Sequence, residues 1–475
     1  MLKKNTTCSI IYTISFFEKE VCFVNIIIVG CGKIGKAILA NLLNEGHNVT
    51  AIDKKQSVLE EITNAFDVMT LCGNGADSDV LNEANAAKCD LFIACTDSDE
   101  NNMLACFLAQ KMGARHSISR IRNPEYNDKS LSFMKSNLGI SVTINPELIV
   151  AKEVLNLLKL PSAVRIETFS RNFELVEIKL SQDSSLDGIT LRDMRDKYKA
   201  KYLICTVQRE DDVFIPDGNF ALKSGDLIGI CAVPSEIQKL FKMLGILKKQ
   251  AKSVMILGGG RPTYYLTKML NELGVTVKIV DKDLATCENL SRLLPNNVII
   301  NGDGAQQDIL VEEGLNEVDA FVSLTGMDEE NILISLFAAL QNVPSVITKI
   351  NSEELTSLSE KIGVQTIVSP VTASSDRVVQ YARALQNSMG SNSIETLYKL
   401  MDGKAEALEF IVTSESDVTN VPFKDLNTKT NILIGGIIRG RKIIIPSGND
   451  SIQKGDRVIV LAAGQRLQDL TDILR

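Results

Sequence analysis

Two long parts of the chain alternate short apolar runs with amphipathic helical patterns. The first run, 26–29, consists of consecutive β-branched residues, which is typical of a strand buried on both faces of a parallel sheet. A helical pattern follows with Ile34, Ile38 and Leu42 on one face, and Gly46 ends it. The pattern continues with strand-like segments at 48–52, 67–71, 90–96 and 117–121 and helical segments at 77–87 and 99–112. This order predicts an α/β lobe built on a parallel sheet.

The chain repeats this pattern from Ser253 onwards. The stretch SVMILGGGRPTYYLTKMLNELGVTVKIVDKD (253–283) again contains a strand, a glycine turn, a helix, a strand and an acid. The segment TGMDEEN at 325–331 matches TDSDENN at 96–102, which lies 229 positions earlier. Several motifs at matching intervals indicate an internal duplication, so we expect two lobes of the same fold.

A shorter module follows each of these lobes. The stretch IPDGNFALKSGDLIGI at 215–230 pairs with IPSGNDSIQKGDRVIV at 445–460, and both are typical of alternating strands joined by turns. An amphipathic helical pattern that begins with proline precedes each module. We therefore predict two Rossmann-like parallel-sheet lobes, each followed by a small α+β lobe. The predicted segments are the first parallel-sheet lobe 24–145, a crossover helix 146–160, the first α+β lobe 161–245, the second parallel-sheet lobe 253–369, a crossover helix 370–386 and the second α+β lobe 392–475.

The composition is that of an ordinary globular protein. The 475 residues are 45% hydrophobic and 23% charged, with a formal net charge of −8 and a pI near 5.2. This acidic balance argues against a nucleic-acid partner or a surface that lies on anionic lipid, since both need a basic face. Ten cysteines without a C-x-x-C pair and only two histidines argue against a metal site or a disulfide framework. We expect no direct membrane insertion, because no run of about 18 apolar residues occurs.

Residues 1–23 differ from the rest of the pattern. The stretch MLKKNTTCSIIYTISFFEKEVCF begins like a signal peptide, but FFEKE ends its apolar run without a small-residue cleavage site. KEV at 19–21 can be encoded by a sequence that contains a bacterial ribosome-binding site, and Val24 can be a GTG start codon. We therefore expect residues 1–23 to be a start-site artefact or a disordered extension.

Polar features at the strand ends provide the candidate chemistry of the first lobe. Gly30, Gly32 and Gly35 form G-x-G-x-x-G between a strand and a helix, and Asp53 ends the next strand 23 positions after Gly30. The glycines allow a tight turn, the approach of a pyrophosphate and close helix packing, while the acid accepts from an adenosine ribose hydroxyl. Such an acid repels a 2′-phosphate, so NAD or another adenine nucleotide is favoured over NADP. Other candidates lie where further strands end, which is where open α/β sheets bind ligands, namely Gly73, Asn74, Thr96 and Arg120.

The second lobe keeps this spacing but changes individual residues. Asp281 again stands 23 positions after the first glycine of its turn, Gly258, and Lys349 takes the place of Arg120. Thr263 replaces the third glycine, which makes close packing of the helix harder, and a lysine lacks the planar fork of an arginine. We expect the second site to bind differently or more weakly than the first, or to be only structural. The polar residues at 97–99 of the first lobe are typical of a helix cap.

Neither lobe shows the groups that a dehydrogenase needs beside its cofactor. Such an enzyme requires a substrate pocket and an acid–base residue, whereas both predicted α+β lobes lack histidine. A duplicated sheet unit with small accessory modules suits a ligand sensor better. Two alternatives stay open, an NAD-dependent oxidoreductase of unknown substrate and a repressor that senses NADH/NAD. The repressor would need a helix-turn-helix and a basic surface, and the sequence shows neither.

Five motifs occur in order along the chain, namely NIIIVGCGKIGKAI, GNGADSDVLNEA, TDSDENNMLAC, SRIRNPEY and VMILGGGRPTYYL. From residue 24 to 475 the chain resembles the TrkA family of nucleotide-binding regulators of bacterial Trk and Ktr potassium uptake, which carry two RCK (regulator of K⁺ conductance) repeats. The resemblance implies a cytoplasmic, non-enzymatic protein, peripheral to the inner face of the plasma membrane, that binds NAD(H), with ATP and ADP as further candidates. Four such chains would form a ring of eight lobes beneath a membrane-embedded potassium uptake subunit of the TrkH, TrkG or KtrB type. Nucleotide binding would change the lobe angles and so bias the pore.

The resemblance also assigns nucleotide contacts to both parallel-sheet lobes. In the first lobe these are Gly30, Gly32, Lys33, Ile34, Gly35, Asp53, Gly73, Asn74, Thr96 and Arg120. In the second lobe they are Gly258, Gly260, Arg261, Asp281, Gly302, Asp303, Thr325 and Lys349. Thr263 departs from the family pattern, so the nucleotide contacts assigned to the second lobe are the weaker prediction.

Overall fold

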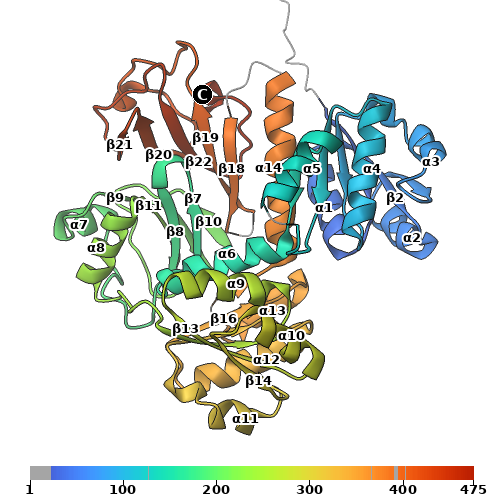
Figure 1. Ribbon diagram of the computed structural model, residues 1–475. Coiled ribbons are helices and arrows are strands. Elements are labelled where there is room, and N and C mark those ends of the chain that lie inside the picture. The colour runs from blue at the N-terminus through green and yellow to red at the C-terminus, as the bar shows by residue number, and fades with distance from the viewer. Residues whose placement is uncertain (1–22, 127, 365, 390–393, 402) are drawn as a thin grey trace, which may run out of the picture.

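The computed structural model describes residues 23–126, 128–364, 366–389, 394–401 and 403–475. The predicted N-terminal extension therefore lies outside the described residues except for Phe23. Figure 1 shows four lobes, which we name N-lobe 1 (strands β1–β6), C-lobe 1 (β7–β11), N-lobe 2 (β12–β17) and C-lobe 2 (β18–β22) in chain order. The predicted tandem arrangement of two α/β lobes, each followed by a smaller lobe, is confirmed.

N-lobe 1 is a six-stranded parallel sheet with helices on both faces and the strand order β3-β2-β1-β4-β5-β6. Its elements are β1 (Asn25–Val29), α1 (Lys33–Asn44), β2 (Asn48–Asp53), α2 (Gln56–Ala65), β3 (Met69–Cys72), α3 (Ser78–Glu83), β4 (Leu91–Ala94), α4 (Asp99–Met112), β5 (His116–Arg120), α5 (Asp128–Leu138) and β6 (Val142–Ile144). The helix predicted at 77–87 ends early, because Asn85 takes a left-handed conformation with φ 60°. The strand order reverses between β1 and β4, which is the place where doubly wound sheets bind ligands.

N-lobe 2 repeats this topology with the order β14-β13-β12-β15-β16-β17. Its elements are β12 (Ser253–Leu257), α9 (Arg261–Glu272), β13 (Thr276–Asp281), α10 (Leu284–Leu293), β14 (Val298–Asn301), α11 (Gln307–Glu312), β15 (Ala320–Ser323), α12 (Asp328–Leu340), β16 (Ser345–Lys349), α13 (Glu353–Lys361) and β17 (Ile367–Val368). The crossover helices are α6 (Pro146–Lys159), after N-lobe 1, and α14 (Pro370–Met389), after N-lobe 2. Both begin at the proline that the sequence pattern predicted.

The C-lobes are five-stranded antiparallel sheets of matching order, β10-β9-β11-β8-β7 and β21-β20-β22-β19-β18. C-lobe 1 contains β7 (Arg165–Thr168), β8 (Glu174–Lys179), α7 (Leu191–Lys197), β9 (Tyr202–Arg209), β10 (Asp212–Phe214), β11 (Leu227–Ala232) and α8 (Pro234–Leu244). C-lobe 2 contains β18 (Ile394–Leu400), β19 (Ala405–Ile411), β20 (Ile432–Arg439), β21 (Lys442–Ile444) and β22 (Arg457–Ala463). The two sheets share one core, in which Phe173 and Leu175 of C-lobe 1 pack with Leu461 of C-lobe 2.

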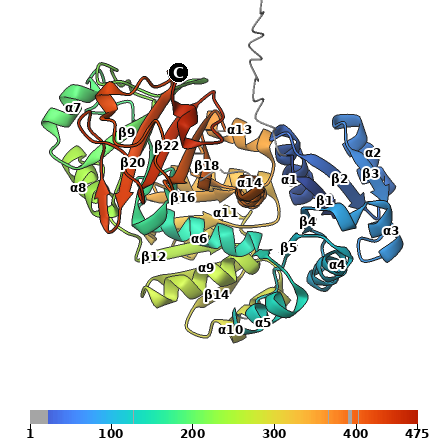
Figure 2. The same ribbon diagram turned by 90° about the horizontal axis from the view of Figure 1, so that it is seen from above.

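The two halves of the chain pack crosswise. α14, which follows N-lobe 2, packs against α1 of N-lobe 1, and its buried Val378 and Val379 join the core of that lobe. α6, which follows N-lobe 1, packs against α9 of N-lobe 2, and its buried Val150 and Val154 join the core that contains Leu266. Seen from above, α14 lies between α1 and β18 (Figure 2). Each N-lobe thus rests on the crossover helix of the opposite half.

A buried charge network holds N-lobe 1 to the second half of the chain. Arg383 of α14 donates through Nε to Glu45, which follows α1, at 2.6 Å, and through its two terminal nitrogens to Glu406 of β19 at 3.0 and 2.8 Å. Lys399 of β18 lies 3.4 Å from Glu45. The side chains of Arg383 and Glu45 are only 8% and 5% exposed. Burial raises the pKa of Glu45, but Arg383 and Lys399 together lower it below its ordinary value, so this carboxylate is charged.

We expect Arg383→Met to destabilise the protein, because it leaves Glu45 and Glu406 buried without their main counterion. Breaking a buried pair on one side costs about 3–5 kcal/mol. The measurement is the urea midpoint of unfolding of the ligand-free protein. Lys36→Met is the matched control, since its pair with Glu61 is exposed (side chains 40% and 68%) and such pairs contribute about 0–1 kcal/mol. Equal shifts for the two variants would contradict the assigned role of Arg383.

Candidate functional site

The glycine turn after β1 is shaped by two close approaches and one open side. Gly30 has φ +87°, and a Cβ atom there would lie 2.7 Å from the backbone nitrogen of Thr96, at the end of β4. A Cβ atom at Gly35 would lie 2.0 Å from the carbonyl oxygen of Gly30, so α1 packs directly on the turn. At Gly32, by contrast, a Cβ atom would meet no atom of the described residues within 4 Å. The first and third glycines serve the fold, and the second leaves room for a ligand.

An acid lies beside this turn in both N-lobes. Asp53, at the end of β2, accepts hydrogen bonds from the backbone nitrogens of Cys31 at 2.8 Å and Lys55 at 2.9 Å. Asp281, at the end of β13, accepts from the backbone nitrogens of Gly259 at 2.5 Å and Asp283 at 2.8 Å. Both carboxylates are therefore held in place next to the glycine turn. This geometry suits the predicted contact to a ribose hydroxyl, which stays a prediction.

A buried asparagine joins two strand ends in each N-lobe. Asn102 of α4 accepts from the backbone nitrogen and hydroxyl of Thr96, at 2.8 and 2.6 Å, and donates to the carbonyl oxygen of Arg120 at 2.9 Å. Asn331 of α12 makes the same set of bonds with Thr325, at 3.0 and 2.8 Å, and with the carbonyl oxygen of Lys349 at 3.0 Å. Sequence reasoning missed both residues. Their signal was present, because each is the last residue of the repeated segments TDSDENN and TGMDEEN.

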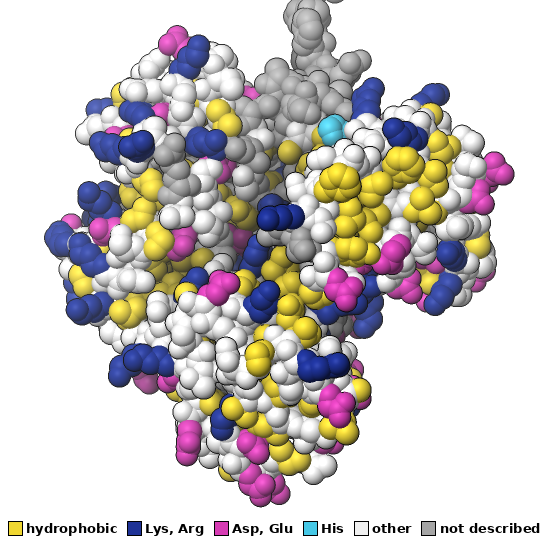
Figure 3. Space-filling model, viewed as in Figure 1, with side chains coloured by type: hydrophobic (Ala, Val, Ile, Leu, Met, Phe, Trp, Pro, Cys, Tyr) yellow, Lys and Arg dark blue, Asp and Glu magenta, His cyan; other side chains and the backbone are white. Residues whose placement is uncertain are grey.

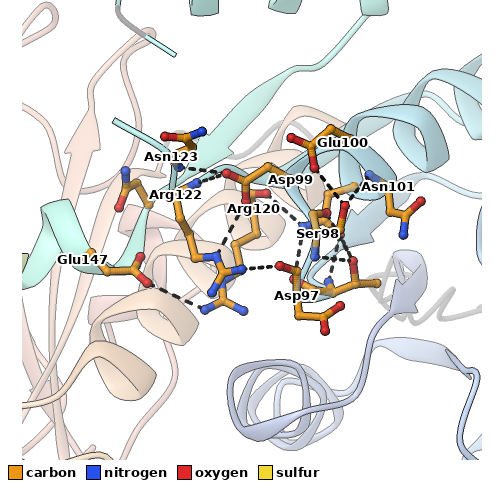
Figure 4. A network of polar contacts seen from close by, with 12 residues as sticks. Asp97, Ser98, Asp99, Glu100, Asn101, Arg120, Arg122, Asn123 and Glu147 are labelled. Carbon is orange, nitrogen blue, oxygen red and sulfur yellow. Dashed lines mark hydrogen bonds and ion pairs between the residues drawn. The ribbon is translucent and has the colours of Figure 1, made fainter. Parts of the chain in front are cut away.

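The polar residues at the start of α4 hold the segment after β5 (Figure 4). Ser98 caps the helix by accepting from the backbone nitrogen of Asn101 at 3.1 Å, as its position in the sequence suggested. Asp99 accepts from the backbone nitrogens of Arg122 and Asn123 at 2.9 and 2.8 Å. The guanidinium group of Arg122 donates to the carbonyl oxygen of Asp97. These groups are thus occupied by contacts within the protein.

Arg120 is differently placed. It ends β5, and its guanidinium group points towards α6, where Nη2 lies 4.0 Å from a carboxylate oxygen of Glu147 (Figure 4). This is an ion pair without a hydrogen bond, and the Nε atom of Arg120 finds no hydrogen-bond partner among the described residues. The cation is therefore available for an anionic ligand. Sequence reasoning missed Glu147, whose acidic character after the proline of α6 was the only sign of a role.

The corresponding site of N-lobe 2 is a cavity of about 390 Å³. The predicted contacts that line it are Gly258, Gly260, Asp281 and Thr325. Gly258 has φ +98°, and a Cβ atom there would lie 2.9 Å from the carbonyl carbon of Leu324. Thr263 is fully buried and donates from its hydroxyl to the carbonyl oxygen of Gly258 at 2.5 Å. A hydrogen bond thus replaces the close contact that the third glycine makes in N-lobe 1.

The sequence of both halves matches known domain families. Residues 26–146 and 254–370 match the TrkA-N domain, and residues 175–245 and 407–475 match the TrkA-C domain. These matches cover most of the chain. The chain belongs to the TrkA family.

Full-length relatives agree with this assignment. The chain is 30% identical over 451 residues to the Trk system potassium uptake protein TrkA homolog of Archaeoglobus fulgidus, covering 95% of this chain and 100% of the relative. It is 28% identical to the Trk system potassium uptake protein TrkA of Haemophilus influenzae, covering 93% of this chain and 96% of the relative. The resemblance predicted from the five motifs is confirmed, and with it the assignment to regulatory proteins rather than to oxidoreductases or repressors.

Solved structures of the same fold include the GsuK RCK domain and the GsuK channel bound to NAD. Both superpose with a TM-score of 0.62, at 16% and 15% sequence identity. The alignments cover 94% of this chain in each case, and 93% and 78% of those chains. At this level of identity the likeness concerns the fold. No helix in the described part of the TrkA-family chain is long and apolar enough to cross a bilayer.

We call each glycine turn, together with the neighbouring strand ends, a cradle. The remaining predicted contacts lie around the two cradles. In N-lobe 1, Lys33 is exposed, whereas Ile34 is buried in the core and can offer only its backbone. Gly73 and Asn74 follow β3, as Gly302 and Asp303 follow β14. Four of the contacts predicted for N-lobe 2 do not line the 390 Å³ cavity, namely Arg261, Gly302, Asp303 and Lys349.

A larger hollow of about 710 Å³ lies at the opposite, amino edge of the sheet in N-lobe 1. Its lining includes Asn25, His47, Asp67 and Lys88, and it does not reach the glycine turn. Open α/β sheets bind their ligands at the carboxyl edge. We therefore assign the candidate site to the cradles, although this hollow has the greater volume.

We expect Gly35→Ala to destabilise N-lobe 1 without any ligand present, because the added methyl group collides with the carbonyl oxygen of Gly30. Overpacking of this kind costs roughly 1–3 kcal/mol. Gly32→Ala is the control, since its methyl group points into open space and should change the free energy of unfolding by less than about 0.5 kcal/mol. Urea denaturation of both variants measures the difference, and equal stabilities would show that α1 is not packed on the turn.

Proposed function

We propose that this TrkA-family protein senses NAD(H) in its two cradles and thereby controls a membrane-embedded potassium uptake subunit of the TrkH, TrkG or KtrB type. As a TrkA-family protein, it is a regulatory component of potassium uptake and not an enzyme. The observation that carries the nucleotide assignment is the open side of the glycine turn at Gly32, beside the fixed carboxylate of Asp53. ATP and ADP share the adenosine part of NAD and are the further candidate ligands.

The charges around the cradles favour an anionic dinucleotide. The first turns of α1 and α9 contain no acid, and Lys33 and Arg261 add positive charge there. By contrast, α4 and α12 begin with acids. A helix N-terminus without acids attracts phosphate through its free N–H groups and its dipole. The carboxylate of Asp53 disfavours a 2′-phosphate, which supports NAD rather than NADP as the ligand.

The crosswise packing offers a route from ligand to partner. Each N-lobe rests on the crossover helix of the other half, so a ligand that closes a cradle changes the angle between the halves. A nucleotide can shift such an equilibrium only by its difference in affinity for the two shapes. To change which of the two shapes is the more populated, the nucleotide must bind one shape about ten- to hundredfold more tightly than the other, which corresponds to roughly 1.4–2.7 kcal/mol. A protein with this task works at the inner face of the plasma membrane, held there by its partner.

Exposed apolar side chains on equivalent helices support assembly into a ring of four chains. Leu104 of α4 and Leu333 of α12 occupy the same position of the repeat and are 48% and 65% exposed. Phe133 of α5 is 70% exposed and Leu340 of α12 is 79% exposed. Figure 3 shows hydrophobic side chains gathered on the face of N-lobe 1 over α4 and α5. Contiguous apolar patches of this kind are typical of protein–protein contacts.

The variant Leu104→Glu/Leu333→Glu should break the ring into smaller assemblies, because each chain then places two charges in the contact. Light scattering after gel filtration would show a mass below that of four chains. Leu284→Glu, at a leucine that is 57% exposed on α10, is the control and should keep the full mass. A complete ring in the double variant would refute the proposed contact surface.

NAD should change potassium flux through liposomes that contain the purified protein and the membrane subunit that copurifies with it. Gly32→Ala should remove the part of this response that comes from the first cradle, because its methyl group occupies the space of the pyrophosphate, and Arg120→Ala should weaken that part. A ligand at about 100-fold excess over the Kd of one site stabilises a protein by roughly 2.7 kcal/mol, and both variants should lose the corresponding part of the rise in melting temperature that NAD causes in the unaltered protein. An undiminished response in Gly32→Ala, or steady consumption of NADH, would refute the proposal.

A further inference from the structure

The cavity of N-lobe 2 extends to both sides of its glycine turn. It reaches Asp281, at the end of β13, on one side, and Thr325 and Glu330, after β15, on the other. The strand order β14-β13-β12-β15 places the glycine turn, which follows β12, between these two ends. In a doubly wound sheet the two mononucleotide halves of a dinucleotide bind on opposite sides of this point. An adenosine half at Asp281 therefore directs the other half towards Glu330.

Glu330 offers this cavity a free carboxylate. It is half-buried in the first turn of α12, and its side chain makes no hydrogen bond or ion pair with the described residues. The other two acids that line the cavity are engaged. Asp281 accepts from the backbone nitrogen of Gly259 at 2.5 Å, and Asp283 accepts from the backbone nitrogen and hydroxyl of Thr286 at 2.9 and 2.6 Å. Glu330 is thus the acid of this cavity that can turn to a ligand.

The backbone that carries Glu330 is held in place. Asn331 accepts from the backbone nitrogen and hydroxyl of Thr325 at 3.0 and 2.8 Å, and the backbone nitrogen of Met327 donates to the same hydroxyl at 3.2 Å. The loop between β15 and α12 therefore has a fixed course. At Gly326, within this loop, a Cβ atom would meet no atom of the described residues within 4 Å, so there is open space in front of the helix.

The first cradle does not offer such an isolated carboxylate at this end. Its residue at the position of Glu330 in the repeat is Asn101, which is neutral. An acid does occur nearby, Asp97, but the guanidinium group of Arg122 donates to its carbonyl oxygen and so places a cation beside it (Figure 4). In N-lobe 2 the counterpart of Arg122 is the neutral Asn351. The two cradles therefore differ in charge at this end.

The bases of N-lobe 2 leave the carboxylate of Glu330 unpaired. Lys349 does not line the cavity, and its Nζ atom lies 3.5 Å from the carbonyl oxygen of Leu324. Among the described residues that line the cavity, Lys282 is the only base, and it directly follows β13 at the adenosine end. A ligand group that lies beside Glu330 therefore meets a negative potential.

The candidate ligands differ in charge beyond their common adenosine part. The nicotinamide ring of the oxidised form, NAD⁺, is a pyridinium cation, whereas the ring of NADH is neutral. ADP and ATP end in phosphates that carry additional negative charge. A carboxylate attracts the cation and repels the phosphates, and it does so more strongly in a partly buried site than in water.

We propose that Glu330 makes the second cradle selective for NAD⁺ over NADH and over ADP. The inference rests on the proposed nucleotide binding and specifies the ligand of N-lobe 2. The first cradle, which has Asn101 at this position, lacks the preference. The two halves of the chain then respond to different properties of the nucleotide pool, and N-lobe 2 responds to the oxidised form of the dinucleotide.

Calorimetric titration of the full-length Gly32→Ala protein tests the second cradle, because the added methyl group closes the first. We expect NAD⁺ to bind about three- to tenfold more tightly than NADH. In this background Glu330→Gln should weaken the binding of NAD⁺ about three- to tenfold and tighten that of ADP by a similar factor, since one lost charge acts with opposite sign on a cation and a phosphate. Damage to the fold would weaken the binding of both. Glu330→Asp, which keeps the charge, should retain the preference for NAD⁺.

Glu329→Gln is the matched control, because it removes an exposed carboxylate of the same helix turn that does not line the cavity. It should leave the ratio of the NAD⁺ and NADH affinities unchanged. Equal affinities in the Gly32→Ala protein, a ratio that Glu330→Gln does not alter, or loss of all dinucleotide binding in Gly32→Ala would overturn the inference and leave the function proposed for N-lobe 1 intact. Absence of NAD binding to the unaltered protein would overturn the proposed function, and the inference with it.

Discussion

Both cradles depend on the close approach of the backbone after the first strand of each N-lobe to the end of the neighbouring strand. A Cβ atom at Gly30 would lie 2.7 Å from Thr96, and one at Gly258 would lie 2.9 Å from Leu324, so only glycine permits the contact. The turn then leads directly into a helix whose free N–H groups face the crevice at the strand-order reversal. The carboxylates of Asp53 and Asp281 complete the arrangement by accepting bonds from the turn itself.

Crosswise packing connects the two similar cradles mechanically. Because α6 packs on N-lobe 2 and α14 on N-lobe 1, neither half can change its lobe angle without moving a helix that belongs to the other. Both contacts have an apolar core. N-lobe 1 is joined to the second half also through the buried charges of Arg383, Glu45 and Glu406.

The asymmetry of the two cradles is as informative as their likeness. Thr263 replaces a close glycine contact by a hydrogen bond, and Lys349 stands where N-lobe 1 has Arg120. If both cradles bind nucleotide, as we propose, we expect differences of this kind to give the two sites unequal affinity. A regulator benefits from such inequality, since it responds over a wider range of ligand concentration than two identical independent sites.

The sequence by itself determined the fold class, the tandem repeat and the position of the glycine turns and their acids. These features are local, because strand burial, helix periodicity and the steric demands of glycine act over a few residues. It did not reveal α5 or the three-residue strand β6, since short or weakly periodic elements carry little pattern. Only the tertiary structure decided that Arg383 meets Glu45, 338 positions away, and that Phe173 of one C-lobe packs with Leu461 of the other. Contacts at such separations depend on how whole lobes pack, and they leave no periodic trace in the chain.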